Sequence, residues 1–331
     1  MNEVRPMPYS RVVFGQFLQD TEDRNCAKDR GGDPIHRIWR RNIPLYMMFV
    51  PIILFFIIFK YVPMFGAIIA FKKYNFADGI LHSPWVGLDN FKLLFSTPTT
   101  LQIIRNTLVI SLLSIFVSFP FPIMLAIMLN EVRRMWFKRI VQTLVYLPHF
   151  FSWIIVSGIV VTVFSQQNGL ISGIWESVTG HTYPFLYREG SWLAIFVGSG
   201  IWKEAGFSAI IYLAALSSID PTLYEAASMD GASRWKQIWH VTLPGLRITI
   251  VLMLILAMGR VMEVGFDQVY MLQNSTVSNI SEVISTYIYK IGLMGSQFSL
   301  TAAMGLFESM VSLILVLIAN AIARRYGNGL W

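Results

Sequence analysis

Cysteine and charged residues are both scarce in this sequence. Cys26 is the single cysteine among 331 residues, which excludes a disulfide framework within the chain and a cysteine-based metal cluster. Charged residues make up 14% of the chain, whereas an ordinary soluble domain carries about 25%. Because 55% of the residues are hydrophobic, the composition indicates a membrane protein.

Signatures of catalysis are also missing. The sequence has no G-x-x-x-x-G-K-[ST] loop and therefore no P-loop for ATP, and it has neither an H-E-x-x-H nor a G-x-S-x-G motif. The five histidines are scattered, and none forms a close pair with metal-ligand spacing. We therefore expect a chain that is not an enzyme and that binds no metal or cofactor itself.

Long apolar runs fill most of the chain. A helix needs roughly 20 largely apolar residues to cross the hydrocarbon core of a bilayer. Six such runs occur, at residues 43–66, 104–129, 140–164, 191–217, 246–270 and 301–323. They are too long for strands and lack alternation, and lipid offers no partner to unpaired backbone groups, so each is expected to be helical. The predicted fold is an all-α membrane domain with six transmembrane helices over residues 41–331.

The distribution of basic residues predicts the orientation. A net charge of +7 could indicate nucleic-acid binding, but most of the 26 Lys and Arg gather near the two termini and in residues 130–139 and 218–247. By the positive-inside bias, these parts face the cytoplasm, and both termini lie on that side of the cytoplasmic (inner) membrane. Nucleic acid is therefore not an expected partner, whereas membrane lipid is. Residues 1–40 form a charged tail without the apolar core of a signal peptide.

Three long connections lie on the opposite side, at residues 72–103, 165–190 and 271–300. They contain turn-forming residues and scattered aromatics, and they are long enough for short helices at the membrane interface. Trp and Tyr at this depth commonly anchor a protein among the headgroups, so we expect anchoring more than direct ligand contact.

The segment 218–244 joins the fourth and fifth expected spans and has the pattern of a docking element. Asp220 before Pro221 is an N-cap followed by a first-turn proline. About two turns of helix follow from Leu223, and Gly231 marks a break before a second short helix. A compact helix-Gly-helix on the face of a membrane protein presents a small knob, which is what mechanical coupling to another protein needs.

This segment resembles the EAA loop of binding-protein-dependent ABC importer permeases. In that pattern, Glu-Ala-Ala is followed after three residues by Gly and further on by Leu-Pro. The matching positions are Glu225, Ala226, Ala227, Asp230, Gly231, Leu243 and Pro244. Five further passages resemble the polysaccharide and oligosaccharide branch of these permeases: KYVPM at 60–64, GLDNF at 87–91, YLPHF at 146–150, IYLAAL at 211–216 and FDQVY at 266–270. The resemblance covers about residues 43–325.

The resemblance implies a type I import permease. This chain would be half of a channel, paired with a second permease that is commonly a different chain. Two ABC ATPase subunits would bind ATP and Mg and receive the EAA helix, with Glu225 facing their basic or amide groups and Gly231 permitting the turn. An extracytoplasmic solute-binding protein would deliver an oligosaccharide, and an acidic, alginate-like one would suit cations buried in the spans.

A polar stripe in the fifth expected span is a candidate for the solute path. Arg260, Glu263, Asp267, Tyr270 and Asn274 follow i, i+3, i+7, i+10, i+14 spacing, so they would share one face of a continuous helix. Charged groups at such depth usually face a bundle interior or a water-filled cavity. The candidate set is completed by Lys203 in the fourth span and Glu308 in the sixth.

Two alternatives remain open. The intramembrane charges are nearly balanced once Glu204 and Lys60 are included, so they also fit an internal ion-pair network that holds helices together. If they do line a path, Arg260 and Lys203 would meet an acidic sugar and Tyr270 would stack on its ring. The acids could instead form the proton relay of an ion-gradient-driven secondary transporter, although such a carrier does not need an EAA loop.

Overall fold

The computed structural model describes residues 34–325, with side chains described from residue 42. Residues 1–33, which contain Cys26 and most of the predicted charged tail, lie outside the described residues. The chain divides into two compact units, Met1–Gly66 and Ala67–Trp331, and each is described by itself.

The described part of the first unit, from residue 34 onward, is a single helical run. α2 (Pro34–Phe56) continues into one π-helical turn, η1 (Ile57–Tyr61), and then α3 (Val62–Met64). The helix begins earlier than the predicted boundary at residue 41, because proline is well suited to a first helical position. Residues Asn42–Phe71 are long and apolar enough to cross a membrane, and none of the most apolar window is buried.

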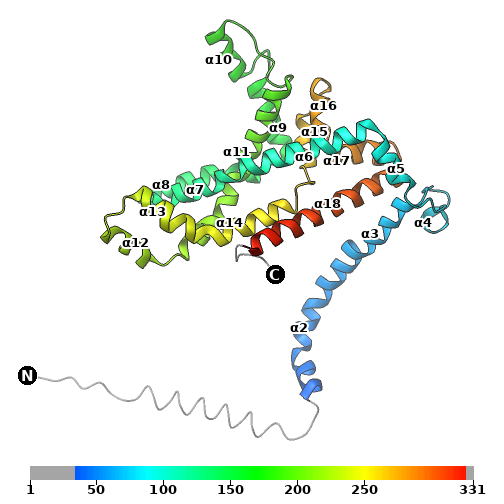
Figure 1. Ribbon diagram of the computed structural model, residues 1–331, viewed down its shortest axis with the longest axis horizontal. Helices are drawn as coiled ribbons and strands as arrows, with labels where there is room; N and C mark the ends of the chain where they lie inside the picture. The colour runs from blue at the N-terminus through cyan, green and yellow to red at the C-terminus, as the bar shows by residue number, and fades with distance from the viewer. Residues whose placement is uncertain (1–33, 326–331) are drawn as a thin grey trace, which may run out of the picture. The chain divides into compact units, whose positions relative to one another are not determined.

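The second unit is built from long helices with short ones between them (Figure 1). The long helices are α6 (Pro98–Ser118), α7 (Pro120–Glu131), α11 (Glu189–Ser217), α14 (Leu243–Met258) and α18 (Phe298–Arg325). The shorter elements up to α11 are η2 (Phe65–Phe71), α4 (Gly79–His82), α5 (Asp89–Ser96), α8 (Met135–Tyr146), η3 (Leu147–Phe150), α9 (Trp153–Phe164) and α10 (Leu170–Thr179). Those after α11 are α12 (Pro221–Met229), α13 (Arg234–Gln237), η4 (Ile238–Thr242), α15 (Phe266–Leu272), η5 (Ser275–Val277), α16 (Ser278–Ser281), α17 (Ile284–Tyr287) and η6 (Ile288–Met294).

The predicted all-α class is confirmed. Within residues 34–325 the extended pairing is limited to one isolated bridge between Lys72 and Trp85. By length and composition, five helices of the described chain could cross a membrane, and one sharply bent pair brings the number to six. The three connections expected to carry short helices contain α4 and α5, α10, and α16 and α17.

Helix α11 lies at the centre of the second unit. It contacts α6, α7, α8, α9, α14 and α15. Its N-terminal half buries Trp192, whose indole Nε1 donates a hydrogen bond to the Leu272 carbonyl at 2.9 Å. Its C-terminal half packs Ala209 and Tyr212 against Ala126 of α7 and Leu246 of α14. α11 is therefore the element against which six other helices of the second unit pack.

Two of the predicted spans are wrong in their geometry. Residues 140–164 do not form one straight helix, because Met135–Phe150 and Trp153–Phe164 meet at 104°. Pro148 lies in the short 3₁₀ turn η3, and the Ser152 hydroxyl accepts the Ile155 N–H and begins a new helix. The fifth span is displaced toward the N-terminus: it runs over Arg234–Met258 instead of 246–270.

Candidate functional site

The EAA segment folds as the sequence predicts. The Asp220 carboxylate accepts the Thr222 N–H at 2.9 Å and caps α12, whose first residue is Pro221. This hydrogen bond is the main reason why the pKa of Asp220 is lowered. After α12, Gly231 adopts φ +73°, a left-handed conformation that a residue with a Cβ rarely takes. The chain can therefore turn back at once into α13.

Two side-chain hydrogen bonds fasten α12 to the helix that follows. The Tyr224 hydroxyl lies 3.0 Å from Thr242 Oγ1 at the end of η4. Gln237 Nε2 donates to Ser228 Oγ at 2.9 Å and to the Ala232 carbonyl at 3.2 Å. Because α13, η4 and α14 are consecutive in one helix, these bonds tie α12 to the N-terminal part of the fifth span.

The remaining EAA residues form the outer face of this knob. Glu225 and Ala226 are exposed, whereas Ala227 is half-buried. Asp230 is exposed at the end of α12, and Leu243 and Pro244 begin α14. The π-helical turn η4 ends at Thr242, two residues before Pro244, which cannot donate a backbone hydrogen bond. α12 and α13 lie together at one end of the unit, opposite α4 and α5 (Figure 1).

The second candidate, Lys203, is buried and belongs to a polar cluster at the bend of the third span. Its ammonium donates to the His149 carbonyl at 2.8 Å and to Glu204 Oε1 at 3.0 Å. The other carboxylate oxygen of Glu204 lies 2.8 Å from His149 Nδ1. Trp153 places its ring 5.4 Å from the same ammonium. For Lys203 the structure therefore favours the ion-pair alternative over contact with solute.

A cavity of about 340 Å³ adjoins this cluster between α6, α7, α9, α11, α14 and α15. Its polar lining includes Glu204, the indole of Trp153 and the amide of Gln268. The remaining polar side chains of the lining are Ser114, Ser118, Ser208 and Tyr212. Hydroxyls, an amide and an aromatic face are groups that can bind a sugar in an otherwise apolar wall.

The predicted polar stripe is not on one helix face. α14 ends at Met258, and residues 259–265 are not helical before α15 begins at Phe266. Val261 and Met262 are buried within this link, whereas Arg260, Glu263 and Asp267 are exposed. The i, i+3, i+7 spacing therefore has no geometric meaning across this break.

The other stripe residues have structural contacts. Tyr270 stacks on Phe266 with ring centroids 5.1 Å apart and meets Tyr289 edge to face at 5.3 Å. Asn274 donates to the Leu186 carbonyl at 2.9 Å, and its Oδ1 accepts the backbone N–H groups of residues 276 and 277. Glu308 on α18 is half-buried and lies within electrostatic reach of Glu263. The structure brings this last pair together.

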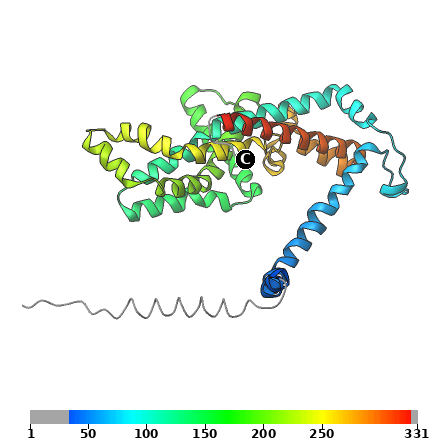
Figure 2. The same ribbon diagram turned by 60° about the horizontal axis from the view of Figure 1, so that its bottom comes forward.

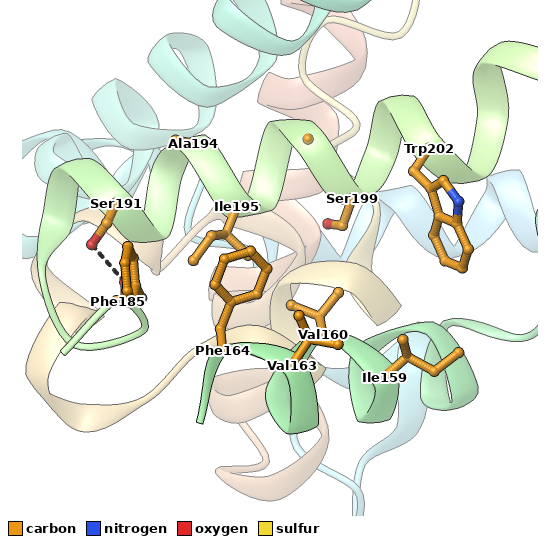
Figure 3. Close-up of a pocket in the computed structure, with 11 residues that line it drawn as sticks. Ile159, Val160, Val163, Phe164, Phe185, Ser191, Ala194, Ile195, Ser199 and Trp202 are labelled. Atoms are coloured by element: carbon orange, nitrogen blue, oxygen red, sulfur yellow. Dashed lines mark hydrogen bonds between the residues drawn. The ribbon is translucent and has the colours of Figure 1, made fainter. Parts of the chain in front are cut away.

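Figure 3 shows a further pocket, of about 500 Å³, between α9 and α11. Ile159 and Phe164 from α9 face Ile195 and Trp202 from α11 across it. The lining is apolar except for two serines, one of which, Ser191, already donates to the Phe185 carbonyl at 2.6 Å. Such a wall suits a lipid chain or another helix better than a sugar.

Sequence reasoning missed His149, Trp153 and Gln268. The local signal that could have located the bend is Pro148 followed by Ser152, a helix stop and an N-cap four residues apart. No local signal reveals that Gln268 reaches α11, where its amide donates to the Phe196 carbonyl at 2.7 Å.

The fold and the exposed coupling element together define a membrane transport subunit. Residues 118–328 match the family of binding-protein-dependent transport system inner membrane components, and the chain belongs to that family. It has the fold of a type I ABC importer permease and is a non-catalytic transport subunit. The ion-gradient-driven carrier is thereby disfavoured, and the predicted resemblance is confirmed.

Relatives of known sequence and structure cover most of the chain. The polygalacturonan/rhamnogalacturonan transport system permease protein YteP of Bacillus subtilis (strain 168) is 46% identical over 86% of this chain and 88% of that protein. Protein LplB of the same organism is 42% identical over 87% and 90%. A chain of a bacterial ABC transporter involved in the import of the acidic polysaccharide alginate superposes with a TM-score of 0.82 at 41% identity, covering 88% of this chain and 99% of that chain. A structure of an alginate ABC transporter in complex with alginate pentasaccharide-bound periplasmic protein gives a TM-score of 0.82 at 40% identity, covering 90% and 99%.

Proposed function

We propose that this chain forms half of the channel of an importer for acidic oligosaccharides in the cytoplasmic membrane. Both termini and α12 would face the cytoplasm, as the basic residues predict. A second permease, two ABC ATPase subunits and an extracytoplasmic binding protein would complete the importer. The ATPase subunits would bind ATP and Mg. Support for the acidic class comes from the similarity to the polygalacturonan and alginate systems.

The coupling role is supported by one observation: α12 is exposed, yet hydrogen bonds hold it to the helix that follows. Glu225 and Ala226 are open to a partner, while Tyr224 and Gln237 tie the helix to the base of the fifth span. Closure of two ATPase subunits would move α12, and the braces would convert this movement into a rigid-body shift of α14. The tight turn at Gly231 would keep the connection between α12 and α13 short.

For the solute, we favour the cavity beside Glu204 over the broken polar stripe. The cavity offers hydroxyl, amide and indole groups, which bind sugar hydroxyls and ring faces. Its carboxylate is paired with Lys203 and His149, so the wall does not present an isolated negative charge to an acidic sugar. Recognition of the sugar carboxylates would then fall chiefly to the binding protein and to the second permease.

The test is ATP-dependent uptake by the complete importer in proteoliposomes. Acidic oligosaccharides, such as oligogalacturonates and oligoalginates, are compared with neutral oligosaccharides of equal length, each presented with the binding protein. We expect ATP-dependent uptake of the acidic series only. Uptake of neutral sugars alone would reject the substrate class, and uptake without an ATPase would reject the proposed mechanism.

The coupling role is tested with Glu225→Arg in the same importer. We expect loss of the copurified ATPase and of uptake, because the reversed charge faces the proposed docking surface. Glu176→Arg, an exposed acid on α10, is the matched control and is expected to retain both. Equal retention of the ATPase by the two variants would show that Glu225 of α12 does not belong to the docking surface.

A further inference from the structure

A polar pocket of about 680 Å³ lies between α6, α11 and α16. Its polar lining consists of Gln102, Arg105 and Asn106 from α6, Glu189 from α11 and Asn279 from α16. The rest of the lining is apolar or glycine. The volume falls within the usual range for sites that bind small ligands.

The pocket lies away from the coupling helix α12. In both views the first turns of α6 lie beside α5, whereas α12 is at the far end of the unit (Figure 1, Figure 2). The residues that line the pocket belong to, or closely follow, the three connections predicted to lie on the outside. Under that orientation the pocket lies on the extracytoplasmic side, where a binding protein would release its solute.

Hydrogen bonds hold the amide side chains of the pocket in place. Gln102 Nε2 and Asn106 Nδ2 both donate to the Asn279 carbonyl at 2.7 Å. Asn106 Nδ2 also donates to the Glu282 carbonyl at 3.2 Å, which ties α6 to the third outer connection. This wall is therefore ordered before a ligand arrives, and its order lowers the entropic cost of binding.

Arg105 and Glu189 place opposite charges in this pocket without pairing. Both side chains are exposed, and neither charged group forms an ion pair or a hydrogen bond with any residue that the structure describes. A ligand that bridges them must offer an anionic group to the guanidinium and hydrogen-bond donors to the carboxylate. A uronic acid unit has both, because its ring bears one carboxylate and several hydroxyls.

We infer that this outer pocket binds one uronate unit of the oligosaccharide before the sugar enters the membrane. The Arg105 guanidinium binds the uronate carboxylate, and the Glu189 carboxylate accepts hydrogen bonds from ring hydroxyls. The inference rests on the proposed import of acidic oligosaccharides, and it gives this chain one cation that is free to meet the sugar. A phospholipid would also offer an anionic group, but its acyl chains would have to cover the amides of Gln102 and Asn106.

The direct test is sugar binding to the complete importer, measured by saturation-transfer NMR without the binding protein. The ligands are trigalacturonate and its methyl ester, which lacks the negative charges. Arg105→Gln should weaken binding of trigalacturonate roughly tenfold and leave binding of the ester unchanged, because only the acid offers a carboxylate to the guanidinium. Equal binding of acid and ester by the native importer would overturn the inference.

The control for surface charge is Lys73→Gln, which removes an exposed cation on the same predicted side of the membrane. Lys73 does not line the pocket, so binding of both sugars should be unchanged. If this variant weakened trigalacturonate binding as much as Arg105→Gln does, general surface attraction would explain the result and the pocket would be rejected.

A second variant fills the pocket and leaves its charges in place. Gly190 lines the pocket, and a Cβ at this position meets nothing within 4 Å. Gly190→Phe should therefore abolish binding of both sugars. Gly173→Phe on α10, where a Cβ is equally unobstructed, should leave binding intact. Copurified ATPase confirms assembly of each variant, and unchanged binding by Gly190→Phe would place the sugar elsewhere and overturn the inference.

A photoreactive group in place of Val109, in the wall of the pocket, identifies the occupant. It should cross-link to labelled trigalacturonate. Cross-linking to a lipid or to the binding protein that excess trigalacturonate does not reduce would overturn the inference.

Uptake separates this inference from the proposed function. If the native importer takes up acidic oligosaccharides and Arg105→Gln does so with the same KM, only the outer pocket is rejected. If the native importer takes up neutral sugars alone, the proposed substrate class is rejected as well.

Discussion

The ammonium of Lys203 lies 2.8 Å from the backbone carbonyl of His149, at the point where the third span bends by 104°. A helix end inside a membrane leaves carbonyl groups without partners, and each such group is costly in lipid. Lys203, 6% exposed, supplies the missing donor from the neighbouring span and is itself neutralised by Glu204. The bend therefore supplies an acceptor for the buried ammonium, and the ammonium supplies a donor for the helix end at the bend.

The first prediction concerns this donor. Lys203→Met should destabilise the purified chain by about 1–3 kcal/mol, because the His149 carbonyl loses its partner and Glu204 loses its counter-charge. Thermal unfolding of the importer measures the effect. Lys92→Met, which removes an exposed 2.8 Å ion pair with Asp89, is the control and should cost at most about 1 kcal/mol. Similar losses in both variants would contradict the role given to Lys203.

A second prediction concerns the approach of α11 to the end of α8. A Cβ at Gly206 would lie 1.9 Å from the Val145 carbonyl oxygen, which is backbone and cannot swing away. Gly206→Ala should therefore destabilise the chain by about 1–3 kcal/mol through overpacking. Gly198→Ala on the same helix meets nothing within 4 Å and should be neutral or slightly stabilising. The two thermal unfolding curves should differ accordingly, and coincident curves would speak against the close contact.

The third prediction concerns the turn after the coupling helix. Gly231→Ala places a Cβ at φ +73°, which costs about 1–2 kcal/mol. Because nothing else lies within 4 Å of that Cβ, the cost should appear as a locally displaced α12 and a reduced ATPase stimulation by substrate. Gly173→Ala in α10 has ordinary helical geometry and serves as the control. Full stimulation in Gly231→Ala would show that the coupling tolerates a looser turn.

The fourth prediction is a pH dependence of α12. The pKa of Asp220 is lowered because its carboxylate accepts the Thr222 N–H, so the cap stabilises the helix at neutral pH. This contribution should be lost as the pH falls through the lowered pKa, below the ordinary value of 3.8. The protection of the Thr222 amide against hydrogen exchange, relative to its intrinsic rate at each pH, should fall in that range. Asp220→Asn keeps an N-cap that does not titrate, so its exchange should lack this acid transition.

Local signals were enough to predict the coupling element. Asp220, Pro221 and Gly231 each act within a few residues, as an N-cap, a first-turn proline and a left-handed turn, so their effect can be read without knowing the rest of the fold. Hydropathy likewise located the apolar runs, because lipid imposes the same requirement on every span.

The candidate solute path could not be predicted in the same way. The stripe from Arg260 to Asn274 assumed a helix that continues through Gly259 and Gly265, and the chain leaves the helix between them. The cavity beside Glu204 gathers side chains from six helices, and its composition depends on how α11 packs against the other five. Periodicity within one segment carries no information about such convergence.

The bend at residues 151 and 152 also bears on how the chain enters the membrane. α9 has 12 residues and therefore rises about 18 Å, well short of the roughly 30 Å of a hydrocarbon core. This half-helix cannot settle as an independent span when it leaves the ribosome. α11 brings the ammonium that satisfies the break, so we expect the third and fourth spans to be integrated as a pair.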